Sequence, residues 1–161
     1  MTAIHIRPAA ESDMQWAVDL WREEMGIEII VVHGEKYDLT TFPGLIADLG
    51  DQRAGIATYR RDEAGDYELL SIHCPLQNQG AGTALIEAVI REAQSKGARR
   101  LWLITTNDNT AALRWYQRRG FRLRALYRGA VVEARKLKPE IPLLGNDNIP
   151  ITDEIELEMT F

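Results

Sequence analysis

A glycine-containing segment in the middle of this 161-residue sequence combines residue types that could bind an anion. It lies between an apolar, strand-like run at 69–74 and a run with helical periodicity from Thr83, and it consists of Gln77, Asn78, Gln79, Gly80, Ala81 and Gly82. Because Gly80 and Gly82 have no side chains, backbone N–H groups there can approach a ligand closely. The following helix adds unpaired N–H donors and the positive end of its dipole. Together these features predict a site for a diphosphate.

Two phosphate-binding motifs do not fit this segment. The dinucleotide fingerprint needs glycines at G-x-G-x-x-G, and Leu85 stands at the third position. The P-loop needs a Lys followed by Ser or Thr after its last glycine, and the sequence lacks this pair here. What remains is Gln-x-x-Gly-x-Gly between a strand and a helix, a pattern that a plain strand-to-helix turn without a ligand would also satisfy.

A second motif, Asn109–Phe121, reads as a short helix with defined ends. Asn109 is a good N-cap and Gly120 a good helix stop. Ala112 and Tyr116 are four residues apart, so they share one face of the helix.

Together the two motifs resemble the GNAT N-acetyltransferase family, over roughly residues 66–127. The resemblance implies that the first motif binds the diphosphate of acetyl-CoA, that the strand at 67–74 pairs with the pantetheine arm, and that the Asn-started helix lies near the coenzyme sulfur. The positions that the resemblance assigns to the coenzyme are Ile72, Cys74, Gln77, Asn78, Gln79, Gly80, Ala81, Gly82, Thr83, Asn109, Ala112 and Tyr116.

The resemblance implies that Tyr116 is the general acid of a direct acetyl transfer from a thioester to an amine. A phenol, with an ordinary pKa of about 10, is protonated at neutral pH and can donate to a departing thiolate. The alternative for Tyr116 is a core aromatic residue. Trp115 is expected to be a core or interface residue.

Glu68 is the predicted general base, because a carboxylate in an otherwise apolar strand would be costly without a role. Glu68 and Ile72 have the same parity and so face one side of the strand. The alternative is a solvent-facing residue near a turn. His73, of opposite parity, is the rival base.

Cys74 is expected to be a small buried hydrophobic residue rather than a nucleophile. No His/Cys cluster has the spacing of a metal site, so no metal is expected.

Composition favours one domain over residues 1–161. The net charge is −5, from 24 acidic and 19 basic residues, and no basic tail or basic-aromatic patch indicates a nucleic-acid partner. Cys74 is the only cysteine, which fits a reducing compartment. The N-terminal residues lack an apolar signal core and no run is long enough for a membrane span. We therefore expect a cytoplasmic protein without a membrane partner.

Hydrophobic periodicity predicts the elements that must position these residues. Helices are expected at 12–25, with a capping box at Ser12–Gln15, and at 82–96 and 109–119; strands are expected at 3–7, 45–49, 54–60, 67–74, 100–105, 121–127 and 154–161. The apolar run at 27–32 is compatible with a helix or a strand, and its composition favours a strand. This order predicts an α+β, three-layer GNAT-like fold, in which a mixed, mostly antiparallel sheet of about seven strands has flanking helices.

The acceptor is the least defined part of the prediction. The resemblance places it between about 26–42 and 127–154, and the second of these segments includes an irregular excursion at 128–153. The acidic residues there would suit a cationic amine, but basic residues are mixed with them, which favours a solvated mixed-charge surface over a specific acidic pocket. The acidic residues are Glu28, Glu35, Asp38, Glu133, Glu140, Asp147 and Asp153. The excursion would serve as an acceptor lid or as a homodimer contact.

Three functions therefore remain open from the sequence alone. The leading one is an acetyl-CoA-dependent N-acetyltransferase acting on a small amine. The others are an acetyltransferase for protein lysines or N-termini, and a CoA-binding regulatory module without activity.

Overall fold

The computed structural model describes residues 2–161, which form a seven-stranded sheet, a two-stranded hairpin and four α-helices. The sheet is mixed and mostly antiparallel, with the order β1-β4-β5-β6-β7-β9-β8, which confirms the predicted fold class. Its strands are β1 (Ile4–Pro8), β4 (Gly44–Leu49), β5 (Gln52–Arg61), β6 (Tyr67–His73), β7 (Arg100–Thr106), β8 (Arg122–Tyr127) and β9 (Glu154–Thr160). The hairpin strands are β2 (Ile29–Val32) and β3 (Glu35–Asp38), and the helices are α1 (Met14–Met25), α2 (Ala81–Ser95), α3 (Thr110–Gln117) and α4 (Ala130–Leu137).

The chain divides into two compact units. The first contains the chain up to Glu28, then Asp38–Leu101 and Phe161; the second contains Ile29–Tyr37 and Trp102–Thr160. Strand β7 contributes its first two residues to the first unit and the others to the second.

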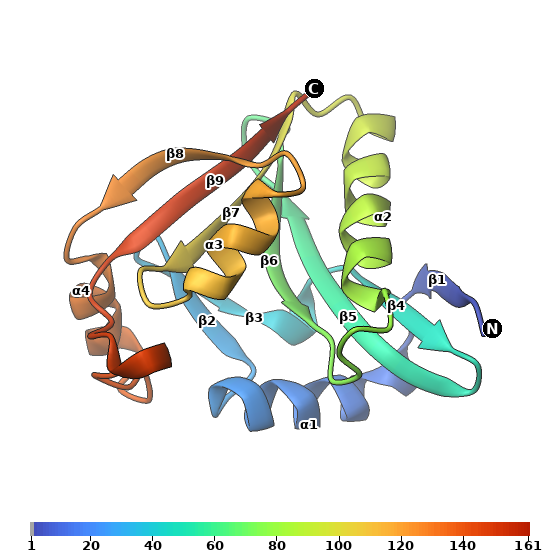
Figure 1. Cartoon of the computed structure of the whole chain (residues 1–161), viewed down its shortest axis with the longest axis horizontal. Coiled ribbons are helices and arrows are strands. Elements are labelled where there is room, and N and C mark those ends of the chain that lie inside the picture. Colours follow the sequence, from blue (N-terminus) through green and yellow to red (C-terminus); the bar gives the residue numbers. More distant parts are fainter. Residues whose placement is uncertain (1) are drawn as a thin grey trace. The chain divides into compact units, whose positions relative to one another are not determined.

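The first unit contains an antiparallel run of strands covered by α2. Strand β4 pairs with β1 and β5, and β5 pairs with β6, all antiparallel. Helix α2 packs against these strands, as Figure 1 shows. Leu85, Val89 and Ala93 are buried on its inner face, as their helical spacing predicts.

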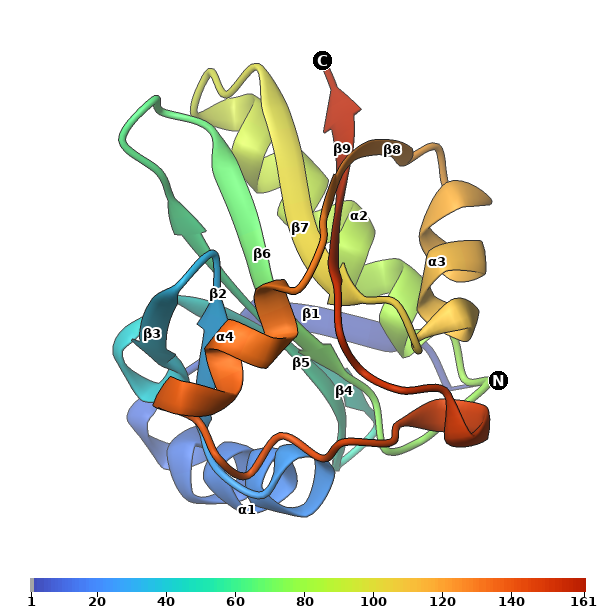
Figure 2. The ribbon, with the colours of Figure 1, turned by 90° about the vertical axis from the view of Figure 1, so that its left-hand side faces the viewer.

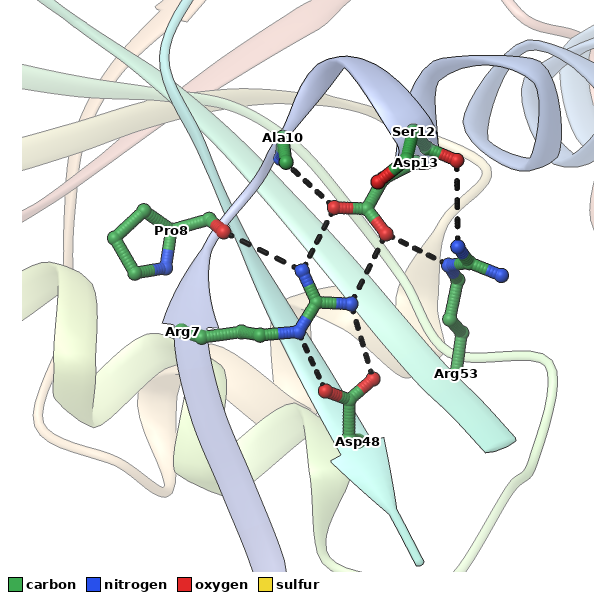
Figure 3. A network of polar contacts seen from close by, with 7 residues as sticks. All are labelled: Arg7, Pro8, Ala10, Ser12, Asp13, Asp48 and Arg53. Atoms are coloured by element: carbon green, nitrogen blue, oxygen red, sulfur yellow. Dashed lines mark hydrogen bonds and ion pairs between the residues drawn. The ribbon is translucent and has the colours of Figure 1, made fainter. Parts of the chain in front are cut away.

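A network of charged side chains joins the start of α1 to the strands of this unit (Figure 3). Arg7 on β1 donates from Nη1 to Oδ2 of Asp13 at 2.7 Å and from Nε to Asp48 on β4 at 2.6 Å. Arg53 on β5 donates from Nε to Oδ1 of Asp13 at 2.8 Å. Asp13 is fully buried, and the hydrogen bond from Arg7 is the main reason that its pKa lies well below the ordinary value.

The capping box predicted at Ser12–Gln15 is wrong. Helix α1 begins at Met14 and has no side-chain cap. A short 3₁₀ turn at Glu11–Asp13 precedes it, and the Asp13 carboxylate accepts the amide N–H of Ala10 at 2.8 Å. The carboxylate that anchors Arg7 therefore also takes the place of a helix cap.

The second unit contains β7 from Trp102 onward, α3, β8, α4, β9 and the β2–β3 hairpin. Strands β8 and β9 pair antiparallel, and α3 packs against β8. Helix α4 lies against β2, beside the hairpin in Figure 2. The expectation that 128–153 is irregular is therefore wrong in part, because α4 occupies Ala130–Leu137 and ends before Pro139.

Two residues that follow β7 anchor the rest of this segment. Asp108 accepts hydrogen bonds at 3.0 Å from the backbone N–H and the side-chain amide of Asn146. The Asn107 side chain accepts the backbone N–H groups of Thr152 and Asp153, also at 3.0 Å. A Cβ at Gly145 would lie 2.0 Å from an oxygen of Asp108, so this close approach requires glycine. The segment is thus held in place by polar contacts to the end of β7.

Strand β8 departs from the predicted alternation. Its pairing with β9 shifts register between Leu123 and Ala125. This bulge changes the side to which the following residues point, and both Leu123 and Leu126 are 58% exposed.

None of the helices in residues 2–161 combines the length and the apolar character needed to cross a bilayer. Over the same residues, no group of three or more His, Cys, Asp and Glu side chains has the arrangement of a metal site.

Candidate active site

The predicted diphosphate loop forms an open turn between β6 and α2 in the first unit. Asn78 and Gly80 both have positive φ, of 59° and 84°. A Cβ at Gly80 would have no neighbouring atom within 4 Å, so the space beside this backbone is open. The turn is exposed to solvent at all four residues from Gln77 to Gly80. The turn therefore offers accessible backbone at the point where the helix begins.

The start of α2 has the properties of an anion site. Gly80 is the N-cap of the helix and makes no side-chain hydrogen bond. The backbone carbonyl of Gly80 accepts a hydrogen bond from the backbone N–H of Ala84 at 3.0 Å. The N–H groups of a helix before this first bond have no partner within the helix. Ala81 and Gly82 occupy such positions, where the helix dipole also favours negative charge.

The end of β6 leads into this turn. Ile72 and Cys74, the positions assigned to the pantetheine arm, are half-buried, and Ile72 pairs with Ala57 of β5. Burial raises the pKa of the Cys74 thiol to about 11 and lowers the pKa of the His73 imidazole to about 4. At neutral pH Cys74 is therefore a thiol and His73 is neutral.

In the second unit, α3 has the ends that the sequence predicts. The Asn109 side chain accepts the N–H of Ala112 at 3.2 Å, which is an N-cap bond. Gly120 follows the helix with a φ of 94°. Tyr116 is 7% exposed, and its ring packs edge-on against Trp115 and Phe121 at centroid distances of 5.0 and 5.4 Å. Asn109, Ala112 and Tyr116 thus belong to one capped helix.

Glu68, the predicted base, is 1% exposed in the first unit. It stands opposite Arg60 in the pairing of β5 with β6, and Arg60 Nε donates to its Oε2 at 2.6 Å. The apolar strand therefore buries a carboxylate at Glu68, as the sequence predicts. The sequence pattern does not predict that Arg60 faces this carboxylate.

Several acidic residues predicted for the acceptor region have local partners instead. Glu28 accepts two hydrogen bonds from Arg22, at 2.9 and 3.0 Å. Asp38 accepts the N–H of Thr40 at 3.0 Å. Asp153 accepts the N–H of Gly129 at 2.9 Å, and Glu133 pairs with Lys136 at 2.8 Å. These four carboxylates therefore have partners within the chain. The others of that set, Glu35, Glu140 and Asp147, are exposed, so a mixed-charge surface is the better interpretation.

A polar and aromatic cluster in the second unit was missed by sequence reasoning. It joins the β2–β3 turn to β7, β8 and β9, and its members are His33, Trp102, Tyr127, Glu154 and Glu156. Glu154 and Glu156 are 2% and 6% exposed, and burial raises the pKa of Glu154. The glutamates of β9 alternate with its apolar residues, yet both of these lie inside the unit. The His-Gly pair between two β-prone runs was the available signal for the turn.

The chain matches the model of the acetyltransferase (GNAT) family over residues 9–121. It is 44% identical to the protein YxbD of Bacillus subtilis (strain 168) over 114 residues, which cover 71% of this chain and 70% of YxbD. It is 27% identical over 128 residues to the amino-acid acetyltransferase of Shewanella oneidensis (strain ATCC 700550 / JCM 31522 / CIP 106686 / LMG 19005 / NCIMB 14063 / MR-1), covering 74% of this chain but only 27% of that longer protein.

The fold is also similar to a solved structure, a GNAT family acetyltransferase from Elizabethkingia anophelis with acetyl-CoA bound. The TM-score is 0.71 at 24% sequence identity, and the match covers 98% of both chains. The family model spans more than half of the sequence, including the turn before α2 and the whole of α3. The chain therefore belongs to the GNAT acetyltransferase family.

Proposed function

We propose that this GNAT acetyltransferase transfers the acetyl group of acetyl-CoA directly to a primary amine of a small molecule. The observation that carries the proposal is the open turn at Gly80, which precedes an α-helix without a side-chain cap. Such a turn suits the diphosphate of the coenzyme. In this proposal the loop from Gln77 to Thr83 binds the diphosphate, Ile72 and Cys74 flank the pantetheine arm, and Asn109, Ala112 and Tyr116 contribute from α3.

The proposed chemistry needs few groups from the protein. The amine nitrogen attacks the thioester carbonyl, a C–N bond forms, and the C–S bond breaks. Tyr116 donates its phenolic proton to the departing thiolate, while a base takes the proton that the amine loses. The raised pKa of Cys74 disfavours a thiolate nucleophile and so supports direct transfer. Glu68 remains the base that the sequence predicts.

A small acceptor is favoured by two observations. The S. oneidensis relative is named as an amino-acid acetyltransferase, and amino acids are small amines. In addition, α4 lies against β2 in the second unit, so the two segments that the family resemblance assigns to the acceptor contact each other. This contact would restrict the size of an acceptor held between them.

Release of free thiol from acetyl-CoA tests the proposal. The purified protein would be incubated with acetyl-CoA and a panel containing the standard amino acids, polyamines and lysine-bearing or free-N-terminal peptides. We expect thiol release with one or more of the small amines. Turnover with peptides alone would instead indicate a protein acetyltransferase. Tight CoA binding without any turnover would indicate a regulatory module.

A further inference from the structure

His33 occupies the turn of the β2–β3 hairpin and is held from several sides within the second unit. Its ring packs edge-on against Tyr127 and Trp102, with centroid distances of 4.6 and 5.6 Å. Its Nε2 lies 3.5 Å from Oε1 of Glu156. The side chain is 33% exposed, whereas that of Glu156 is 8% exposed. A partly accessible imidazole is thus backed by a buried carboxylate.

The carboxylate is itself oriented. The Tyr127 hydroxyl donates to Oε1 of Glu156 at 2.9 Å, the same oxygen that faces the His33 ring. A base whose partner is fixed by a third group is the arrangement used in many enzymes for proton transfer. Glu154, two residues before Glu156 on β9, accepts the backbone N–H of His33 at 3.2 Å and so fixes the turn as well.

The backbone at His33 is in the left-handed region, which is uncommon for residues other than glycine. His33 and Gly34 both have positive φ, of 50° and 72°. Two-residue hairpin turns of this kind favour Asn-Gly, because asparagine tolerates the left-handed region. Histidine is, like asparagine, enriched in this region compared with other non-glycine residues, so the turn can present an imidazole at its first position.

The other candidate bases are less suited to accept a proton from a substrate. His73 has an imidazole whose pKa burial lowers to about 4, and its Nδ1 is buried without a hydrogen-bond partner. His5 lies exposed on β1, in the first unit. Glu68 is 1% exposed and bonded to Arg60, so it is far less accessible to an ammonium than the His33 side chain. Imidazole is the side chain best matched to proton transfer near neutral pH.

The cluster also joins the two segments that the family resemblance assigns to the acceptor. His33 lies in the first of them, at 26–42, and Tyr127 and Glu154 lie in the second, at 127–154. We infer that His33 accepts a proton from the acceptor's ammonium group, and that Glu156 is the positioning residue that orients the imidazole. The inference rests on the proposed function, and it differs from the sequence-based choice of Glu68.

The proton balance follows from the geometry. With Nε2–H facing Glu156, Nδ1 is the basic nitrogen. It takes one proton from the ammonium, giving a neutral amine and an imidazolium that the Glu156 carboxylate stabilises. The amine then attacks the thioester carbonyl, and the thiolate leaves with a proton from Tyr116. The remaining nitrogen proton passes to water, and the imidazolium and phenolate return to their starting states by exchange with solvent.

Charged and aromatic groups from several elements surround His33. Glu154 and Glu156 face it from β9, Tyr127 faces it from β8, and the Trp102 ring of β7 carries no charge. On α4, which packs against β2, Glu133 pairs with Lys136, and Arg135 donates to the carbonyls of Ile141, Pro142 and Ile151. The two buried carboxylates are therefore the charges that contact His33 directly within these elements.

The test is the pH dependence of kcat/KM, measured as thiol release with the amine that the wild type uses best. His33→Asn keeps a residue that suits the positive φ, so it removes the imidazole with little change to the turn. We expect at least a tenfold loss of kcat near neutral pH, an unchanged KM for acetyl-CoA, and a flattened acidic limb. Glu156→Gln should lower kcat and leave the KM for acetyl-CoA unchanged, because an amide at this position orients the imidazole less well than the carboxylate does. His5→Asn is the matched control and should behave as the wild type does.

The outcomes separate this inference from the proposed function. An active wild type whose acidic limb is unchanged in folded His33→Asn would overturn the role of His33 and leave the proposed function standing. Wild-type kcat in folded Glu156→Gln would overturn the positioning role. A wild type that releases no thiol with any amine or peptide of the panel would overturn the proposed function, and the inference with it.

Discussion

Arg60 and Glu68 face each other across β5 and β6, and Arg60 Nε lies 2.6 Å from Oε2 of Glu68. The carboxylate is 1% exposed, whereas the arginine side chain is 23% exposed. A buried carboxylate that accepts a charge-assisted hydrogen bond stabilises the fold whether or not it takes part in catalysis.

Glu68→Gln separates these two roles. Losing the charge leaves the guanidinium of Arg60 without its carboxylate, and we expect a loss of about 1–3 kcal/mol in the free energy of unfolding. Chemical denaturation would measure this loss. If His33 is the base, the acidic limb of the pH–rate profile should persist in this variant. If the limb flattens in Glu68→Gln and persists in His33→Asn, the sequence-based choice of Glu68 is correct.

Tyr116→Phe tests the proposed general acid. The substitution removes the hydroxyl but keeps the ring that packs against Trp115 and Phe121. We expect kcat to fall by roughly ten- to a thousand-fold with little change in the KM for acetyl-CoA, because the donor is needed mainly as the thiolate forms. Tyr59→Phe, a hydroxyl deletion outside the proposed site, is the control and should retain wild-type kcat. Wild-type kcat in Tyr116→Phe would show that water or another group protonates the thiolate.

Asp13 should make the stability of the chain depend on pH in acid. Its pKa in the folded state is lowered, mainly by the hydrogen bond from Arg7, whereas in the unfolded chain it is about 3.9. The folded state therefore binds fewer protons, so this contribution to stability is full above about pH 4 and is lost as the pH falls toward the folded pKa.

Asp13→Asn removes that contribution. At neutral pH we expect a loss of about 2–4 kcal/mol in the free energy of unfolding, because two arginines lose a buried carboxylate while Arg7 keeps Asp48. Its stability should also change less with pH below 4 than that of the wild type. Asp51→Asn, at an exposed position, is the control. Equal pH dependence of unfolding in Asp13→Asn and the wild type would contradict this role.

The elements and the loop could be predicted from the sequence because their signals are local. The strand before Gln77, the glycines and the periodicity of α2 are all close in sequence, as are Asn109 and Gly120 at the ends of α3. The sequence does not decide between helix and strand for the hairpin at 29–38, because its two strands are only four residues each. The structure shows the turn through the positive φ of its two residues.

The polar contacts could not be predicted because they depend on the register between paired strands or on contacts between residues far apart in the sequence. Arg60 and Glu68 meet through strand pairing whose register includes a bulge after Thr58. His33 and Glu156 meet although they lie near opposite ends of the chain. Glu154 and Glu156 alternate with the apolar residues of β9 and are nevertheless buried, since periodicity shows which residues share a face but not whether a second layer covers that face.

Binding of acetyl-CoA to a loop variant tests the central claim most directly. Gly80 and Gly97 stand at opposite ends of α2, with φ of 84° and 75°, and an added Cβ at either would meet no atom within 4 Å. Valine at either position should cause similar backbone strain, of about 1–2 kcal/mol, but only valine at Gly80 would block the approach of a diphosphate. By calorimetry on folded protein, we predict that Gly80→Val weakens acetyl-CoA binding at least tenfold and that Gly97→Val does not. Equal affinity in the wild type and Gly80→Val would contradict the account.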